Sequence, residues 1–183
     1  MKRSIVLQRT LPVLLAVIAC LLIVLYHPVP IHAQNSAGAF ISKDASAKDV
    51  GLPLYPGSKA VVDKDKSDSS SANMGLWLGG AGFQLVVVKM HTSDSPEKVA
   101  AYYRKALAKY GAVLDCTNAP AQKDKDNDSS NKLTCGDDKP DTGGMLFKAG
   151  TKEVQHLVSV DSDGSGTIYS LVYLVAKGKE AEL

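Results

Sequence analysis

The chain has 183 residues, which is enough for one domain and a targeting segment. Its formal net charge of +2 depends on Lys2, Arg3 and Arg9; the remainder holds 18 basic and 19 acidic residues and carries a charge of about −1. This balance argues against a nucleic-acid-binding protein and against one that coats an anionic surface, because both need a concentrated positive field.

The first 33 residues have the order of an export signal. The three basic residues precede an apolar run over 11–26, and Ala33 supplies the small side chain at the end of a cleavage motif at 31–33. The basic flank stays in the cytoplasm. We therefore expect the rest of the chain to be exported, as a periplasmic or secreted protein.

Two other interpretations of this segment stay open. The run over 11–26 could be retained as an anchor in the inner membrane, although it has 16 residues and about 20 are needed to span a bilayer. Alternatively, Val17-Ile18-Ala19-Cys20 resembles the lipobox of bacterial lipoproteins, which would make Cys20 the lipidated residue. In all three cases we expect membrane contact only through this N-terminal segment.

A change of composition follows the export signal. Residues 34–51 hold Ser, Ala, Gly, Lys and Asp with few large apolar side chains, so we expect a flexible linker. Residues 52–178 are expected to form a single domain, and 179–183 a C-terminal tail. Near the start of the domain, Pro56-Gly57 indicates a turn and 60–62 a short strand.

Two apolar segments then surround a glycine-rich stretch. Residues 76–78 and 83–90 are typical of strands, and Gly79, Gly80 and Gly82 between them indicate either a hairpin or one bulged strand. The continuous apolar run over 86–88 predicts a central strand that is covered on both faces.

Residues 95–111 predict one amphipathic helix. Pro96 suits the first helical position, and Gly111 permits the backbone conformation that ends a helix. Apolar and aromatic side chains recur between them at spacings of three and four, which places them on one stripe. This stripe consists of Val99, Tyr102, Tyr103, Ala106, Leu107 and Tyr110.

Further strand segments follow the helix. Residues 112–116 and 132–135 are expected to pair across a polar loop, and 145–148, 153–160 and 167–175 are further strands. The composition of 161–166 predicts a hairpin loop between the last two. The fold class expected is α+β, with an antiparallel sheet of about five to seven strands packed on the one main helix.

Two stretches carry a resemblance to known proteins. Leu54-Tyr55-Pro56-Gly57-Ser58, and later the sequence DSPEKVAAYY from Asp94 to Tyr103, resemble a loose set of exported, mostly uncharacterised bacterial proteins with a YPGA…DSPEKVAAFY pattern. Ser58 replaces the usual Ala and Tyr102 the usual Phe. The similarity covers residues 54–111. It implies a small α+β domain outside the cytoplasm, and it carries no known active site.

The cysteines after the N-terminal segment are Cys116 and Cys135. In an oxidising compartment we expect them to form a disulfide. Two free thiols or a metal pair are the alternatives, but a metal site needs further Cys or His ligands nearby.

Asp161, Asp163 and Ser165 are weak candidate ligands for calcium. Their spacing matches the first part of an EF-hand loop, because carboxylates at alternate positions converge on a hard cation. The twelfth position should be Glu and is Val172, and the flanks alternate like strands. A polar hairpin that needs no ion is the simpler interpretation. No cofactor is expected.

His91 lies close in sequence to Ser93, Asp94 and Ser95, which are residue types that a hydrolase uses. The sequence has no Gly-x-Ser-x-Gly elbow to position a nucleophile, so a hydrolase would need a deep pocket with His91 or His156 beside a carboxylate. Trp77, with Leu76, Leu78 and Phe83, is interpreted as core, an exposed ligand surface being the alternative.

The function expected is that of a non-catalytic cell-envelope protein that binds a small ligand or a protein partner. An extracytoplasmic hydrolase with an unrecognised site is the first alternative, and a calcium-binding module is the second.

Overall fold

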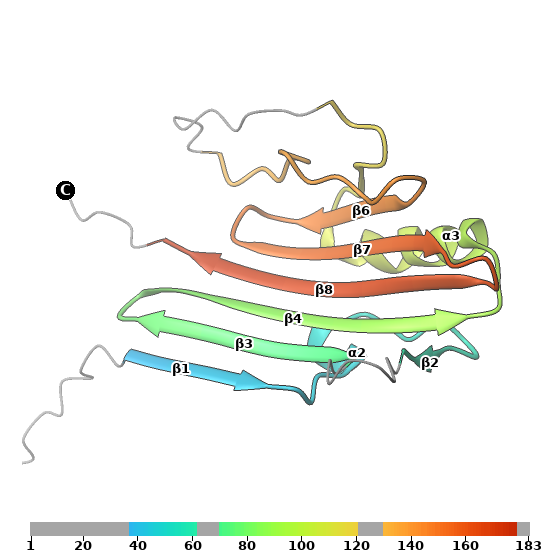
Figure 1. Cartoon of the computed structure of the whole chain (residues 1–183). Coiled ribbons are helices and arrows are strands. Elements are labelled where there is room, and N and C mark those ends of the chain that lie inside the picture. The colour runs from blue at the N-terminus through green and yellow to red at the C-terminus, as the bar shows by residue number, and fades with distance from the viewer. Residues whose placement is uncertain (1–36, 62–69, 121–129, 179–183) are drawn as a thin grey trace, which may run out of the picture. The chain divides into compact units, whose positions relative to one another are not determined.

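The computed structural model describes residues 37–61, 70–120 and 130–178, which fall within one compact unit (Figure 1). The strands are β1 (Ala37–Ser42), β2 (Lys59–Ala60), β3 (Ser71–Leu78), β4 (Ala81–Thr92), β5 (Leu114–Asp115), β6 (Met145–Gly150), β7 (Val154–Ser162) and β8 (Thr167–Lys177). The helices are α2 (Ala47–Val50), α3 (Pro96–Leu107) and the 3-10 helix η1 (Ala108–Tyr110).

The eight strands form one antiparallel sheet in the order β1-β3-β4-β8-β7-β6-β5, with β2 pairing with β4 beyond the end of β3. Figure 1 shows β1 at one edge of the sheet and α3 alongside β7. The α+β class with an antiparallel sheet is confirmed. The sheet has eight strands where five to seven were expected, because β1 was taken for linker.

The main helix, α3, begins with Pro96 in its first turn, and Ser95 is the N-cap residue before it. η1 continues it to Tyr110, and Gly111 follows with a φ of 121°. Val99, Tyr103 and Leu107 are fully buried on the side that faces the sheet, where α3 packs on β7 and β6. The predicted stripe of apolar side chains therefore forms the helix side of the core.

The two faces of the sheet are covered differently. Val86 and Val88 of β4 point to the helix side and are buried, whereas Val87 between them points to the other face and is half-buried. The run over 86–88 is therefore a central strand, as predicted, between β3 and β8, but its second face is only partly covered. On the second face, the buried positions Leu133, Leu146 and Lys148 lie in β6 or in the segment that contains the disulfide.

Residues 37–51 are a correction to the expected linker. β1 pairs with β3 over its whole length, and α2 buries Val50 completely. Small side chains do not exclude a strand, because the ladder of backbone hydrogen bonds to β3 holds it in place. Tyr110 Oη donates a hydrogen bond to Gly51 O (2.6 Å), which attaches the end of α2 to the end of the main helix.

Two further differences concern pairing. Gly79 and Gly80 form a tight turn, so β3 and β4 are a hairpin and not one bulged strand. β5 pairs with β6 and not with residues 132–135, which contribute a single bridge from Lys132 to Thr151. The predicted hairpin between β7 and β8 is confirmed by the pairing of Ser162 with Thr167.

Candidate functional site

A cluster of tyrosines joins the two stretches of the bacterial resemblance. Tyr103 Oη accepts a hydrogen bond from Tyr55 N (3.0 Å) and donates one to Pro53 O (3.1 Å), and Tyr55 Oη donates to Asp94 Oδ2 (2.8 Å). Hydrogen bonds from Lys98 and Tyr55 hold the pKa of Asp94 below its ordinary value. These contacts attach the segment before β2 to the start of α3, so both motifs have structural roles.

His91 and Asp163 form the contact that most resembles catalytic machinery. His91 Nε2 lies 3.0 Å from Asp163 Oδ2, and both side chains are partly exposed. The hydroxyl of Ser165 donates to Asp163 Oδ1 (3.0 Å). A nucleophilic serine must instead bond to the imidazole, so these three side chains do not have the geometry of a catalytic triad.

The three candidate calcium ligands do not converge. Asp161 Oδ1 lies against the Cα of Gly144, and burial, with repulsion from Asp141, raises the pKa of Asp161. Asp163 accepts hydrogen bonds from the backbone and side chain of Ser165, which lower its pKa. Within the described ranges 37–61, 70–120 and 130–178, no three His, Cys, Asp or Glu side chains come close enough to hold an ion.

His156 has a packing role. The ring is buried, stacks on Tyr110 with 3.5 Å between the ring centroids, and places Nδ1 3.0 Å from Val50 O. Because the carbonyl can only accept, Nδ1 carries the proton. Burial lowers the pKa of His156, so the imidazole is neutral near pH 7. This neutral ring connects α2 with the sheet and the end of the main helix.

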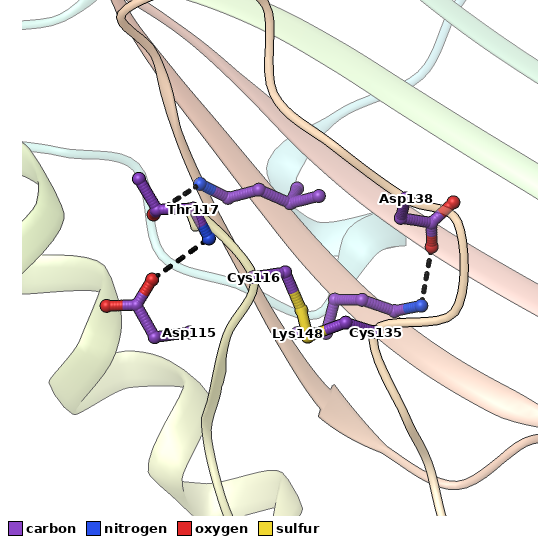
Figure 2. Close-up of a disulfide and its surroundings, with 7 residues drawn as sticks. Asp115, Cys116, Thr117, Cys135, Asp138 and Lys148 are labelled. Carbon is purple, nitrogen blue, oxygen red and sulfur yellow. Dashed lines mark hydrogen bonds and ion pairs between the residues drawn. A yellow bond between two sulfur atoms is a disulfide. The ribbon is translucent and has the colours of Figure 1, made fainter. Parts of the chain in front are cut away.

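The expected pair, Cys116 and Cys135, forms a disulfide that fixes a segment over the face of the sheet opposite α3. Figure 2 shows the bond next to Lys148 of β6 and Asp138. The Lys148 side chain is 5% exposed, and its ammonium lies 2.5 Å from Asp138 Oδ2. A buried ammonium needs an opposite charge, and the disulfide holds that charge in place because Cys135 precedes Asp138 by three residues.

Two cavities lie around this segment. One, of about 500 Å³, is lined mainly by residues 117–119 and 139–145, and a smaller one of about 280 Å³ is lined by residues 133–138 and by neighbours on the sheet. Neither is lined by His91 or His156. The arrangement that would have favoured a hydrolase is therefore not found in these two cavities.

The largest unexplained feature is a group of exposed apolar side chains on β1, β3 and the start of β4. The exposed fractions are 42% for Phe40, 81% for Ile41, 39% for Leu76, 60% for Leu78 and 40% for Phe83. We call these five residues the apolar sheet end. They lie on the β3–β4 hairpin and on the neighbouring β1, and the turn of this hairpin is at the end of the sheet away from α3 (Figure 1).

Register explains why α3 does not cover four of these five side chains. Leu76 pairs with Phe83, and both point to the face opposite α3 together with Leu78 and Ile41. Leu76, Leu78 and Phe83 were interpreted as core, and the structure corrects this. The signal that could have predicted this exposure is the alternation of side chains along a strand. Alternate residues point to opposite faces of the sheet, and the sequence predicts only one main helix to cover them.

The helix-side face of the same hairpin carries aromatic rings over glycines. The ring of Trp77 lies over Gly82, where an added Cβ would be 2.2 Å from it, and the ring of Phe40 lies over Gly75, where the distance would be 2.5 Å. In these cross-strand pairs an aromatic ring covers the backbone of a glycine on the neighbouring strand, at a place where no helix covers the sheet. Phe40 and Ile41 were missed because they fall in the expected linker.

The strand segments that carry these five residues contain no charged side chain. No Asp, Glu, Lys or Arg occurs in β1, in β3 or in residues 81–88 of β4. An exposed surface of this kind is typical of a site that binds another apolar surface.

In the described part of the chain, no helix is long and apolar enough to cross a membrane, and the run over 11–26 lies outside that part. No family model, no curated protein and no solved structure matches this chain.

Proposed function

We propose that this chain is an exported, non-catalytic interaction module of the cell envelope, and that the apolar sheet end is its binding surface. The single observation that carries the proposal is the exposure of five large apolar side chains on β1, on β3 and on residues 81–88 of β4, which contain no Asp, Glu, Lys or Arg. Leaving such surface in water is unfavourable by about 25 cal/mol per Å². Covering it with a partner recovers that free energy.

The chemistry of the other features supports a binding role over a catalytic one. The His91 imidazole is paired with Asp163, and the Ser165 hydroxyl bonds to that carboxylate. His156 and the tyrosines are engaged in packing and backbone contacts. Export is supported by the order of basic and apolar residues at the N-terminus and by a disulfide, which is compatible with an oxidising compartment.

Site-specific photocrosslinking in cells tests the proposal. A photoreactive residue is placed in the full chain at Leu78, which is 60% exposed, and as a control at Lys105 on the exposed side of α3. We expect discrete cross-linked species from position 78 and none from position 105. A second variant, Phe83→Asp, should abolish these species while the disulfide remains formed.

The outcome that contradicts the proposal is equal, diffuse labelling at both positions, or labelling at position 78 that Phe83→Asp leaves unchanged. Export is tested separately by cell fractionation and by the mass of the purified chain. That mass distinguishes cleavage after Ala33 from retention of residues 11–26 and from a lipid on Cys20.

A further inference from the structure

We propose that a second copy of this chain binds at the β1 edge of the apolar sheet end, and that the two copies pair through β1, antiparallel and edge to edge. The proposal rests on the proposed function, since it names the occupant of the same surface. It joins two sheets into one continuous antiparallel sheet, because every strand pair in the sheet is already antiparallel.

β1 lacks the features that keep an edge strand from pairing. All five residues from Ala37 to Ile41 are exposed and Ser42 is half-buried, yet the strand contains no charge, no proline and no bulge along its pairing with β3. Edge strands that stay single usually carry a lysine or a proline, or are very short. β1 is six residues long, which is enough for a ladder.

The opposite edge of the sheet differs in length and in charge. It is formed by β5, which has two residues, one of them Asp115, which pairs with Arg104 of α3. The Cys116–Cys135 disulfide lies directly after it. With only one edge suited to pairing, association through β1 closes at two copies and does not continue into a fibre.

The lack of charge favours an uncharged partner. The surface around β1 presents no Asp, Glu, Lys or Arg on the strands that form it, so it offers nothing to steer a charged partner. It does match another uncharged apolar surface, and its own copy is one. Phe40 on the helix side and Ile41 on the opposite face both project from the edge residues and would gain neighbours on pairing.

The register of such a pair follows from the faces of the sheet. Gly38, Phe40 and Ser42 lie on the side of α3, and Ala37, Ala39 and Ile41 on the other. Residues opposite each other in an antiparallel pair point to the same side. Even-numbered residues must therefore face even-numbered ones across the two-fold axis.

One residue of β1 therefore lies opposite its own copy at the two-fold axis. The longest overlap of the two strands makes that residue Ala39 or Phe40. With Ala39 on the axis, Phe40 lies opposite Gly38 of the second copy, which repeats the aromatic–glycine pairing found twice within the chain. With Phe40 on the axis, the two Phe40 rings meet and Ile41 lies opposite Ala39.

Cysteine scanning tests this geometry in the full-length chain. Single cysteines replace Ala37, Ala39, Phe40 and Ile41 in a Cys20→Ala background, and mild oxidation is followed by electrophoresis without reductant. Each step away from the axis separates a residue from its own copy by two more residues, about 7 Å along the strands. We expect dimer formation to peak at position 39 or 40 and to fall by at least tenfold at position 37.

A matched pair of charge variants completes the test. Ala39→Lys places a charge on the edge, and Ala101→Lys places one on an exposed position of α3. Ala39→Lys, added to the Phe40→Cys chain, should reduce cross-linking at least tenfold, and Ala101→Lys should leave it unchanged.

Uniform cross-linking along β1, no cross-linking at any of its positions, or equal effects of the two lysines overturns the proposal. If β1 gives no self-cross-link while position 78 still captures a different protein, only the second copy is refuted as the partner. If neither position captures anything, the proposed function fails as well.

Discussion

Removing the hydroxyl of Tyr103 should destabilise the domain far more than the same change at the adjacent Tyr102. Tyr103 is fully buried, and its Oη accepts from Tyr55 N and donates to Pro53 O. Burial raises the pKa of Tyr103, so the phenol stays protonated and able to donate. Tyr102 is part-exposed, and its Oη makes a single hydrogen bond of 3.2 Å to the exposed Leu54 O.

The magnitude follows from what each substitution leaves behind. Tyr103→Phe leaves the Pro53 carbonyl without this donor inside the protein, which costs about 1–3 kcal/mol. Tyr55 N is partly compensated by Tyr169 Oη at 3.4 Å, so we expect a loss of about 2 kcal/mol. Tyr102→Phe lets water replace the lost contact and should cost at most about 0.5 kcal/mol.

Urea denaturation of the chain from residue 35 onward, followed by circular dichroism, measures both values. For a domain of this size, a loss of about 2 kcal/mol corresponds to a fall in Tm of roughly 4–8 °C. Equal losses for the two variants would refute the role of the tyrosine cluster in holding the segment before β2. The reasoning would also be refuted if the difference in free energy of unfolding between Tyr103→Phe and the unchanged chain disappeared once both curves were fitted with the same denaturant slope.

Three further predictions concern stability. Burial holds the pKa of His156 below its ordinary 6.5, so the unfolded chain binds the proton more readily, and the free energy of unfolding should fall as the pH drops below about 6.5. Thermal unfolding between pH 7 and 5 measures this slope, which His156→Gln should flatten; an unchanged slope would contradict the assignment. Reduction of Cys116–Cys135, which closes 19 residues, should cost about 3 kcal/mol, and a urea midpoint that does not respond to reductant would contradict this. Gly82→Ala forces a Cβ to within 2.5 Å of Leu76 O and should cost about 2 kcal/mol, whereas Gly80→Ala, with open space around it, should change the free energy of unfolding by less than about 0.5 kcal/mol; equal values from thermal unfolding would count against the packing of the hairpin.

The features that local chemistry determines could be predicted from the sequence. The helix over 95–111 has a proline at its start, an apolar stripe and a glycine at its end, and the structure has all three in place. The hairpin at 161–166 and the pairing of Cys116 with Cys135 are likewise local in the chain. Each rests on a signal contained within about 20 residues.

The features that depend on distant neighbours were missed. β1 has the composition of a linker, and it is a strand only because β3 offers it an open edge. Leu76, Leu78 and Phe83 have the composition of a core, and they stay exposed because they point to the face of the sheet opposite α3. Composition indicates whether a side chain favours burial. Strand register and the position of the helix determine whether it is in fact buried.

The ammonium of Lys148 bears on the order of events during maturation. This lysine sits in the middle of an apolar strand, and its counter-ion Asp138 arrives on a segment that Cys135 fastens. A polypeptide that has not yet been oxidised holds that carboxylate only loosely, and β6 then carries a charge that opposes its docking. Thiol oxidation would in that case act as the step that completes the sheet, and a reduced chain would remain open for longer to proteases and chaperones.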